Sequence, residues 1–234
     1  MTFATFASGI EAASVAWHPL GWKPAYFSEI NRWKCALLEQ RWHGVPNIGD
    51  MTKAHESKIF KNTPVDLIAA GTPCTDWSNA GRRAGMDGAN AQLTLVFLTL
   101  LGIARPRWVV WENVPAVLSH AGGRDFAAIL AGFRRIGYCC AWRVLDAQYF
   151  GLAQRRKRLF LVGHLGTDWR PPAAVLFERH SFGGHPAPGR EKREGFTHDI
   201  APSLTGNGAG GSYAGKSDGG DALVPVVAPT LTIG

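Results

Sequence analysis

The sequence is poor in cysteine and has no apolar run long enough to cross a membrane. Its four cysteines have neither the spacing of a zinc site nor the pattern of a disulfide framework (Cys35, Cys74, Cys139 and Cys140). The amino terminus lacks the basic and apolar segments of a secretory signal peptide. We therefore expect no metal site and no membrane segment, and a reducing, cytoplasmic setting.

Acidic residues are also scarce relative to basic ones. Lysine and arginine number 25 against 18 aspartates and glutamates, which gives a formal net charge of +7. This excess favours a polyanionic partner, although net charge reports on association and not on fold. The basic residues gather in short clusters of the kind that can follow a nucleic acid backbone (82–83, 105–107, 134–135 and 155–158).

Short apolar runs alternate with amphipathic, helix-length stretches over most of the chain. Strands are expected at 2–6, 25–29, 66–70, 107–112, 140–145 and 159–163, and helices at 11–17, 32–42, 91–103 and 124–136. This alternation predicts an α/β fold with a mostly parallel sheet. The composition becomes rich in glycine and proline after residue 165, so we expect a catalytic domain over 1–165 and extended or poorly ordered structure over 166–234.

Three segments carry reactive or charged side chains at the ends of apolar runs. Thr72-Pro73-Cys74 follows the run 65–71, Glu112-Asn113-Val114 follows 108–111, and Gln154-Arg155-Arg156-Lys157-Arg158 precedes 159–162. Enzymes with a doubly wound sheet bind their ligands at the carboxyl ends of the strands. A thiol, a carboxyl group and paired guanidinium groups are therefore expected to converge on one sheet edge.

A fourth segment has the features of a nucleotide-binding loop. Ala7, Ser8, Gly9, Ile10 and Glu11 follow the first expected strand, where small residues let a ligand approach the backbone. Glu29 ends the second strand 20 residues after Gly9, the distance at which an acid reaches a pair of ribose hydroxyls. The second and third glycines of a dinucleotide fingerprint are absent, so the loop does not predict a dinucleotide.

The order and spacing of these segments resemble the DNA (cytosine-5) methyltransferases of bacterial and phage restriction-modification systems, over about residues 3–180. The resemblance implies a Rossmann-like, doubly wound methyltransferase fold, S-adenosyl-L-methionine as cofactor, and a bacterial or phage-infected cell as the setting. It places Glu29 on the ribose and Asp50 on the adenine amino group. It places the rest of the cofactor site at Ala7, Ser8, Gly9, Ile10, Glu11, Ile30, Met51, Pro73 and Leu93.

The resemblance also implies the catalytic roles. Cys74 would add to C6 of cytosine, because C5 alone is a poor nucleophile, and Arg156 and Arg158 would favour the reactive thiolate. Glu112 would hold the N3 edge of the base, and Arg158 would contact O2. The base must leave the DNA duplex, so we expect the loop 75–90 to close behind it, with phosphate contacts from its polar residues (Ser78, Arg82 and Arg83).

The sequence departs from the family in three places. Ala7 stands where an aromatic residue is usual, Thr75-Asp76-Trp77-Ser78 replaces the usual loop sequence, and the family's final segments do not occur before Gly234. The resemblance implies double-stranded DNA as substrate, and the missing segments lead us to expect a further polypeptide that supplies them. Methylation of cytosine in tRNA and a non-catalytic role in binding DNA or cofactor remain open alternatives, as does an inert buried thiol for Cys74.

Overall fold

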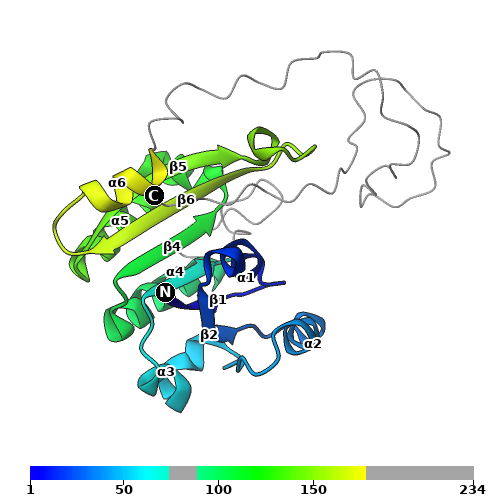
Figure 1. Ribbon diagram of the computed structural model, residues 1–234. Coiled ribbons are helices and arrows are strands. Elements are labelled where there is room, and N and C mark those ends of the chain that lie inside the picture. The colour runs from blue at the N-terminus through cyan, green and yellow to red at the C-terminus, as the bar shows by residue number, and fades with distance from the viewer. Residues whose placement is uncertain (74–88, 178–234) are drawn as a thin grey trace, which may run out of the picture.

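The structure is a computed structural model that describes residues 1–73 and 89–177 (Figure 1). Its described strands form one sheet in the order β2-β1-β3-β4-β6-β5. Strands β1 to β4 run parallel, and β6 is antiparallel to both of its neighbours. The strands are β1 (Thr2–Phe6), β2 (Lys23–Ser28), β3 (Leu67–Gly71), β4 (Trp108–Asn113), β5 (Tyr138–Asp146) and β6 (Lys157–Leu165).

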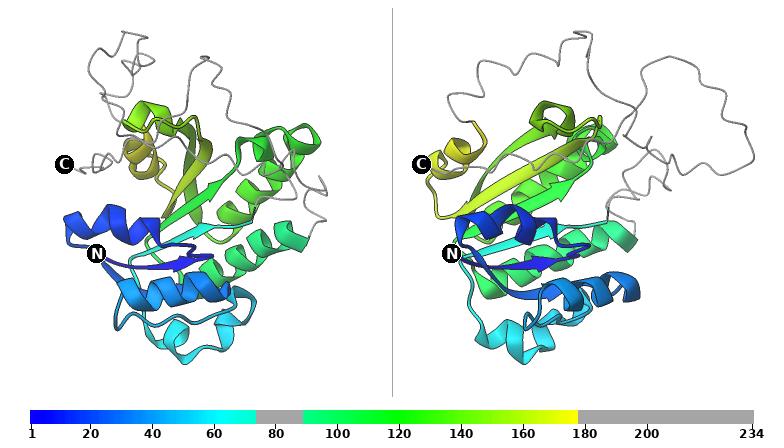
Figure 2. Two further views of the ribbon diagram at one scale, coloured as in Figure 1. Left: turned by 90° about the vertical axis from the view of Figure 1, so that its right-hand side faces the viewer. Right: turned by 45° about the vertical axis from the view of Figure 1, so that its right-hand side comes forward.

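Helices cover both faces of this sheet (Figure 2). The first face packs against α3 (Lys58–Asn62), α4 (Ala89–Ala104) and α5 (Arg124–Arg135). The second face carries α1 (Ala12–Trp17) over β1 and α6 (Arg170–Leu176) over β5 and β6, while α2 (Arg32–Arg41) follows the end of β2. Short 3-10 turns connect them at His18–Leu20, Met51–Glu56, Pro115–Leu118, His120–Gly123 and Ala147–Phe150.

The alternation of side chains along β1 explains the two layers. Phe6 packs against Tyr26 and Phe97 on the first face, whereas Phe3 meets Trp17 edge to face at 4.9 Å on the second. Successive residues of a strand point to opposite faces, so the apolar side chains of Phe3 on one face and of Ala4 and Phe6 on the other require cover on both sides. The larger core lies under α4 and α5, where the biggest side chains are fully buried.

The predicted doubly wound, mostly parallel sheet is confirmed, with each expected strand present. The expectation of extended structure after residue 165 is wrong for residues 170–176, which form α6. Pro171 lies in the first turn of this helix. Proline is tolerated there because the first helical N–H has no intrahelical partner. Arg143 of β5 donates to the Leu176 carbonyl at 3.0 Å and lies 5.8 Å from the Phe177 ring centroid, so this helix is attached to the sheet.

The division into domains at residue 165 stays a prediction, and residues 178–234 lie outside the described part. None of the described helices is long and apolar enough to cross a membrane. Among the same residues, no three or more His, Cys, Asp or Glu side chains gather in a way that could hold a metal ion.

Candidate active site

The carboxyl ends of β1, β2, β3 and β4 form one edge of the sheet. The chain leaves β1 for β2 on one side and later returns to β3 on the other side, so the strand order switches between β1 and β3. Loops diverge at such a switch point and leave a crevice outside the strand ends, where α/β enzymes bind their ligands. The described residues of the predicted cofactor and catalytic groups can be placed relative to this edge.

The loop after β1 turns sharply and is tied to β2. Ala7, Gly9 and Glu11 all have positive φ, at 51°, 63° and 63°. A Cβ atom on Gly9 would meet no other atom within 4 Å, so open space borders this glycine. Ser8 accepts from the Ser28 amide through Oγ at 3.1 Å, and its own amide donates to the Ser28 carbonyl at 3.2 Å. These bonds fix the loop beside the end of β2.

Glu11 stabilises the loop after β1 through buried hydrogen bonds. Its carboxyl group is buried, accepts from the Thr5 hydroxyl at 2.6 Å and accepts from the amide and hydroxyl of Ser14 at 3.0 and 2.9 Å. Burial raises the pKa of Glu11 above its ordinary value, against the effect of these hydrogen bonds. Because its oxygens are already bound by Thr5 and Ser14, the side chain shapes the turn and caps α1.

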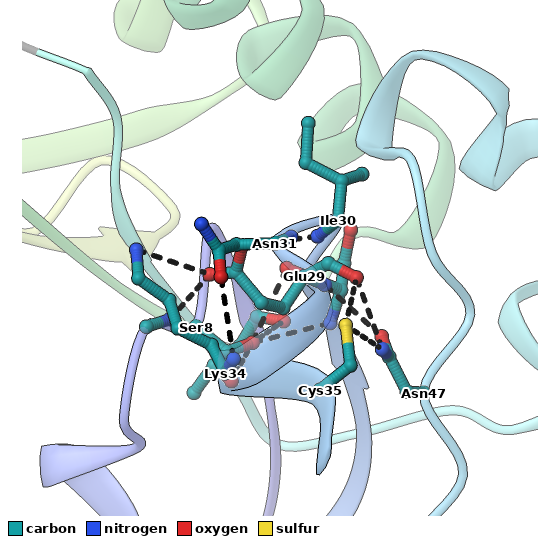
Figure 3. A network of polar contacts seen from close by, with 10 residues as sticks. Ser8, Glu29, Ile30, Asn31, Lys34, Cys35 and Asn47 are labelled. Carbon is teal, nitrogen blue, oxygen red and sulfur yellow. Dashed lines mark hydrogen bonds and ion pairs between the residues drawn. The ribbon is translucent and has the colours of Figure 1, made fainter. Parts of the chain in front are cut away.

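Glu29 lies directly after β2 and reaches the β1 loop (Figure 3). Its Oε2 accepts from the Gly9 amide at 2.8 Å, and its Oε1 accepts from the amides of Ile30 and Asn31 at 3.0 and 2.8 Å. Lys34 Nζ lies 3.8 Å from Oε2. A carboxylate has about four acceptor positions, so Oε2 can take one more donor without losing the Gly9 bond.

Asp50 comes to the same edge through the segment that follows α2. Its Oδ1 accepts from the amide and hydroxyl of Thr52 at 2.9 and 2.8 Å, and these bonds lower the pKa of Asp50. The Ser28 hydroxyl donates to the Gly49 carbonyl at 2.7 Å, which ties this turn to β2. Met51 is buried beneath it.

Exposed apolar side chains border these carboxylates. Ile10 is 55% exposed and Ile30 is 73% exposed, although both are large and apolar. Carboxylates that accept hydrogen bonds, an open glycine and exposed aliphatic groups together suit a ligand with hydroxyls and a flat heteroaromatic ring. The residues present at this edge therefore fit a nucleoside-containing cofactor.

The end of β3 is fixed from below by a buried hydrogen-bond network around Thr72. Trp111 Nε1 donates to the Thr72 hydroxyl at 2.8 Å, and Thr94 of α4 lies 3.0 Å from the same oxygen. Asn113 Nδ2 donates to the Thr72 carbonyl at 3.2 Å. These contacts set the position of the backbone that continues into Pro73, which is partly buried.

Glu112 and Arg158 meet above this network. Arg158 Nε lies 2.8 Å from Glu112 Oε1, and the two side chains are 24% and 31% exposed. Strand pairing places Glu112 opposite Gly71, and a Cβ on Gly71 would lie 3.2 Å from Glu112 Oε2. A charged pair that is partly open to solvent thus lies next to the end of β3.

The reversed direction of β6 brings the arginine to this place. Because β6 is antiparallel to β4, its first residues lie at the carboxyl end of β4, with Leu159 opposite Asn113. The Arg156 amide donates to Asp146 at 3.1 Å, which holds the start of β6 against the end of β5. The Arg156 side chain is exposed at the same edge.

The family model for C-5 cytosine-specific DNA methylases matches residues 1–183. The chain belongs to this family.

The matched relatives include a DNA N-6-adenine-methyltransferase of Escherichia phage P1, 36% identical, with 89% of this chain and 34% of the relative aligned. Type II methyltransferase M2.BsuMI of Bacillus subtilis is 31% identical, with 77% and 46% aligned. Type II methyltransferase M.AquIA of Picosynechococcus is 32% identical, with 70% and 73% aligned. The chain spans a third to a half of the length of the first two relatives.

Solved structures agree on the fold. The S. pombe Dnmt2 methyltransferase matches with a TM-score of 0.57 at 18% identity, over 72% of this chain and 52% of that one. A putative DNA modification methyltransferase encoded within an E. coli prophage gives 0.59 at 18% identity, over 70% and 47%. At this identity the likeness concerns the fold alone.

Not all of the predicted family residues fall within the described part. Cys74, Ser78, Arg82 and Arg83 lie outside the described residues. Leu93 lies on α4, where it is partly buried and packs against the core. The described cofactor residues other than Leu93 and Pro73 gather around the ends of β1 and β2, and Glu112, Arg156 and Arg158 lie at the ends of β4, β5 and β6.

Sequence reasoning missed several residues that hold the site. Trp111 and Asn113 support Thr72 from β4, and Lys34 and Asn47 surround Glu29. The adjacency of Asn113 to Glu112 was an available signal, because a strand-end amide often bonds a neighbouring backbone. Asn47 had no such signal, since its contacts depend on how its segment returns along β2.

Proposed function

We propose that this protein transfers a methyl group from S-adenosyl-L-methionine to C5 of a cytosine in double-stranded DNA, through a covalent bond between Cys74 and C6 of the base. The observation that carries this proposal is the Glu112–Arg158 pair beside the end of β3, because Glu112 lies opposite Gly71, three residues before Cys74. Membership of the C-5 cytosine-specific DNA methylase family supports the same reaction.

The cofactor would lie at the ends of β1 and β2. Glu29 Oε2 would accept a hydrogen bond from a ribose hydroxyl in addition to the one from Gly9. Asp50 would accept a hydrogen bond from the adenine amino group. Ile10 and Ile30 offer exposed aliphatic surface for the flat ring. When bound, S-adenosyl-L-methionine supplies an electrophilic methyl group attached to a sulfonium.

The protein's own side chains would act on the base. The Cys74 thiolate adds to C6 and forms a carbon–sulfur bond, which moves electron density onto C5 and makes C5 nucleophilic. The negative charge that develops at N3 and O2 is met by Glu112, which shares a proton with N3, and by Arg158 at O2. C5 would take the methyl group as the bond from that group to the sulfonium sulfur breaks and leaves a neutral thioether. Loss of the C5 proton to water then expels the thiolate and restores the aromatic ring. Arg156 and Arg158 add positive charge to the site and favour the thiolate.

The name of the phage P1 relative suggests adenine N6 as a second candidate target. An exocyclic amino group carries its own lone pair and needs no thiolate to activate it. A Thr-Pro-Cys segment next to a carboxyl group and a guanidinium group would then have no chemical task. The arrangement of Thr72, Glu112 and Arg158 therefore favours cytosine C5.

Methyl transfer from labelled S-adenosyl-L-methionine to duplex DNA and to tRNA tests this proposal. We expect label in DNA alone, and 5-methylcytosine as the labelled nucleoside after digestion. Label in tRNA, or recovery as N6-methyladenine, would contradict the proposed substrate. Binding of DNA with no transfer under any condition would favour the non-catalytic alternative.

We also propose that a further polypeptide segment, in the same chain or in another, completes the enzyme. Trp108, Val110 and Phe160 are apolar but only partly buried on the sheet face between α1 and α6. Val15 on α1 is 56% exposed. Apolar surface of this kind commonly marks an interaction site. The chain and M.AquIA align over similar shares of their lengths, 70% and 73%, so a family relative of similar length is known.

A further inference from the structure

The side-chain amide of Asn47 uses its whole hydrogen-bonding capacity on the segments that carry Glu29 and Asp50. Its Oδ1 accepts from the amides of Glu29 and Gly49 at 3.0 and 3.1 Å. Its Nδ2 donates to the Glu29 carbonyl at 3.0 Å and to Cys35 Sγ at 3.2 Å (Figure 3). A primary amide has two acceptor positions and two N–H donors, so all four are occupied.

We propose that Asn47 is a positioning residue for the cofactor, which holds the two carboxylates of the site in place without touching the ligand. This inference rests on the proposed function. It assigns Asn47 no direct contact, because no donor or acceptor of its amide is left for a ligand.

Asn47 extends the pairing of its segment with β2 as far as Glu29. Residues 46–49 run parallel to the end of β2, with the Phe27 amide donating to the Pro46 carbonyl at 2.9 Å and the Ile48 amide donating to the Phe27 carbonyl at 2.8 Å. Backbone pairing stops there. The Asn47 side chain then bonds both the amide and the carbonyl of Glu29, as a further strand residue would. It thereby fixes the peptide groups on both sides of the Glu29 Cα.

Asn47 also holds the turn that leads to Asp50. The Gly49 amide donates to the same Oδ1 atom, and the Gly49 carbonyl accepts from Ser28 at 2.7 Å. Gly49 has a φ of 77°, a left-handed turn that aims the next residue toward the sheet edge. One amide oxygen of Asn47 thus connects the backbone of Glu29 to the turn that presents Asp50.

No other residue type offers the same set of bonds at this position. Aspartate has the same shape but no N–H donor, and its second oxygen would face the Glu29 carbonyl oxygen. Alanine removes all four bonds. Because Asn47 is exposed and contributes nothing to the apolar core, its replacement removes contacts of the site and leaves the core intact.

The test compares wild type, Asn47→Ala and Asn47→Asp by calorimetric titration with S-adenosyl-L-methionine and by thermal unfolding. We expect both variants to bind about tenfold more weakly, which is the loss expected from one to two net hydrogen bonds, while their melting temperatures stay close to that of wild type. Asn62→Ala in α3 is the matched control, since it removes an exposed asparagine away from the site and should leave affinity unchanged.

A residue that only filled space would tolerate the isosteric aspartate, so wild-type affinity in Asn47→Asp would overturn the inference. Unchanged affinity in Asn47→Ala would overturn it as well. Hydrogen exchange of the ligand-free protein separates this inference from the proposed function. The amides of Gly9, Ile30 and Asn31, which Glu29 holds, should exchange about tenfold faster in Asn47→Ala.

If wild type binds no S-adenosyl-L-methionine, the proposed function fails. The exchange rates then decide the positioning role, and equal rates in wild type and Asn47→Ala would refute it.

Discussion

Thr72 shows how single residues connect the described structure to the predicted nucleophile. Two residues before Cys74, its hydroxyl and carbonyl receive hydrogen bonds from Trp111 and Asn113 of β4. The sequence predicted the thiol, the carboxyl group and the arginines at one edge, because strand-end residues can be located from apolar runs. It could not predict the bonds around Thr72, since they depend on which side chains face each other beneath that edge.

Thr72→Val should destabilise the protein by about 1–3 kcal/mol, because the buried Trp111 N–H would lose its acceptor while the side-chain volume is kept. The rate of methyl transfer should also fall, since the segment leading to Cys74 loses the hydrogen bonds of the Thr72 hydroxyl. Urea unfolding and turnover measure the two effects. Thr72→Ser should retain both properties, and Thr99→Val on the exposed side of α4 should change stability by less than about 0.5 kcal/mol. Equal stability of Thr72→Val and wild type would remove Thr72 from this role.

Glu11→Gln should change the pH dependence of stability. Burial raises the pKa of Glu11 above its ordinary value of 4.5, so between these two pKa values the folded protein binds more protons than the unfolded chain. Wild type therefore loses stability as pH rises through this window, whereas glutamine does not titrate. The stability of Glu11→Gln relative to wild type should increase with pH from about 4.5 and then level off. Urea unfolding across this range measures it, and a constant or decreasing difference would contradict the burial argument.

At the scale of elements, the strands and four of the helices could be predicted, whereas the direction of β6 and the existence of α3 and α6 were not. The apolar run of β6 is compatible with either direction. Only the short connection from Asp146 to Lys157, which contains no α-helix, indicates an antiparallel return, because a parallel crossover usually needs an α-helix and a dozen or more residues. For α6, the glycine and proline content of the whole tail obscured a local helix start at Arg170, with Pro171 in the first turn.

The packing of β6 against β4 and β5 depends on a residue without a side chain. A Cβ on Gly163 would lie 2.5 Å from Val109 Cγ1 and 3.3 Å from Cys140 Sγ, in a buried layer. Gly163→Ala should therefore destabilise the protein by about 1–3 kcal/mol, through overpacking. In Gly102→Ala on α4 the new atom would meet Ile136 at 3.5 Å, an ordinary contact, so this control should be neutral or up to about 1 kcal/mol more stable. Thermal unfolding of both variants measures these changes in stability. A Gly163→Ala variant as stable as wild type would contradict the packing described.

At the scale of the whole molecule, the chain contains the sheet edge that carries the candidate site but spans only part of its longer relatives. It aligns with 34% of the phage P1 protein and 46% of M2.BsuMI. The partly buried residues between α1 and α6 identify the sheet face that a further segment would cover.

Residues 1–234 alone should therefore be weakly active and prone to self-association. Addition of a polypeptide that carries the family's later segments should restore methylation and give a defined complex. Light scattering coupled to size-exclusion chromatography measures the association, and transfer of labelled methyl groups measures the activity. A monodisperse monomer with full, sequence-specific methylation and no added polypeptide would contradict this prediction.

The most direct test of the central claim is covalent capture by duplex DNA that carries 5-fluorocytosine in place of cytosine. After Cys74 has added to C6 and C5 has been methylated, fluorine leaves no proton at C5 for the step that would release the thiol. With S-adenosyl-L-methionine present, wild type should form a complex that survives denaturing electrophoresis, with the linked peptide containing Cys74, and Cys74→Ser should form none. The same complex in Cys74→Ser, or methylation of ordinary duplex by wild type with no capture on the fluorinated duplex, would contradict catalysis through Cys74.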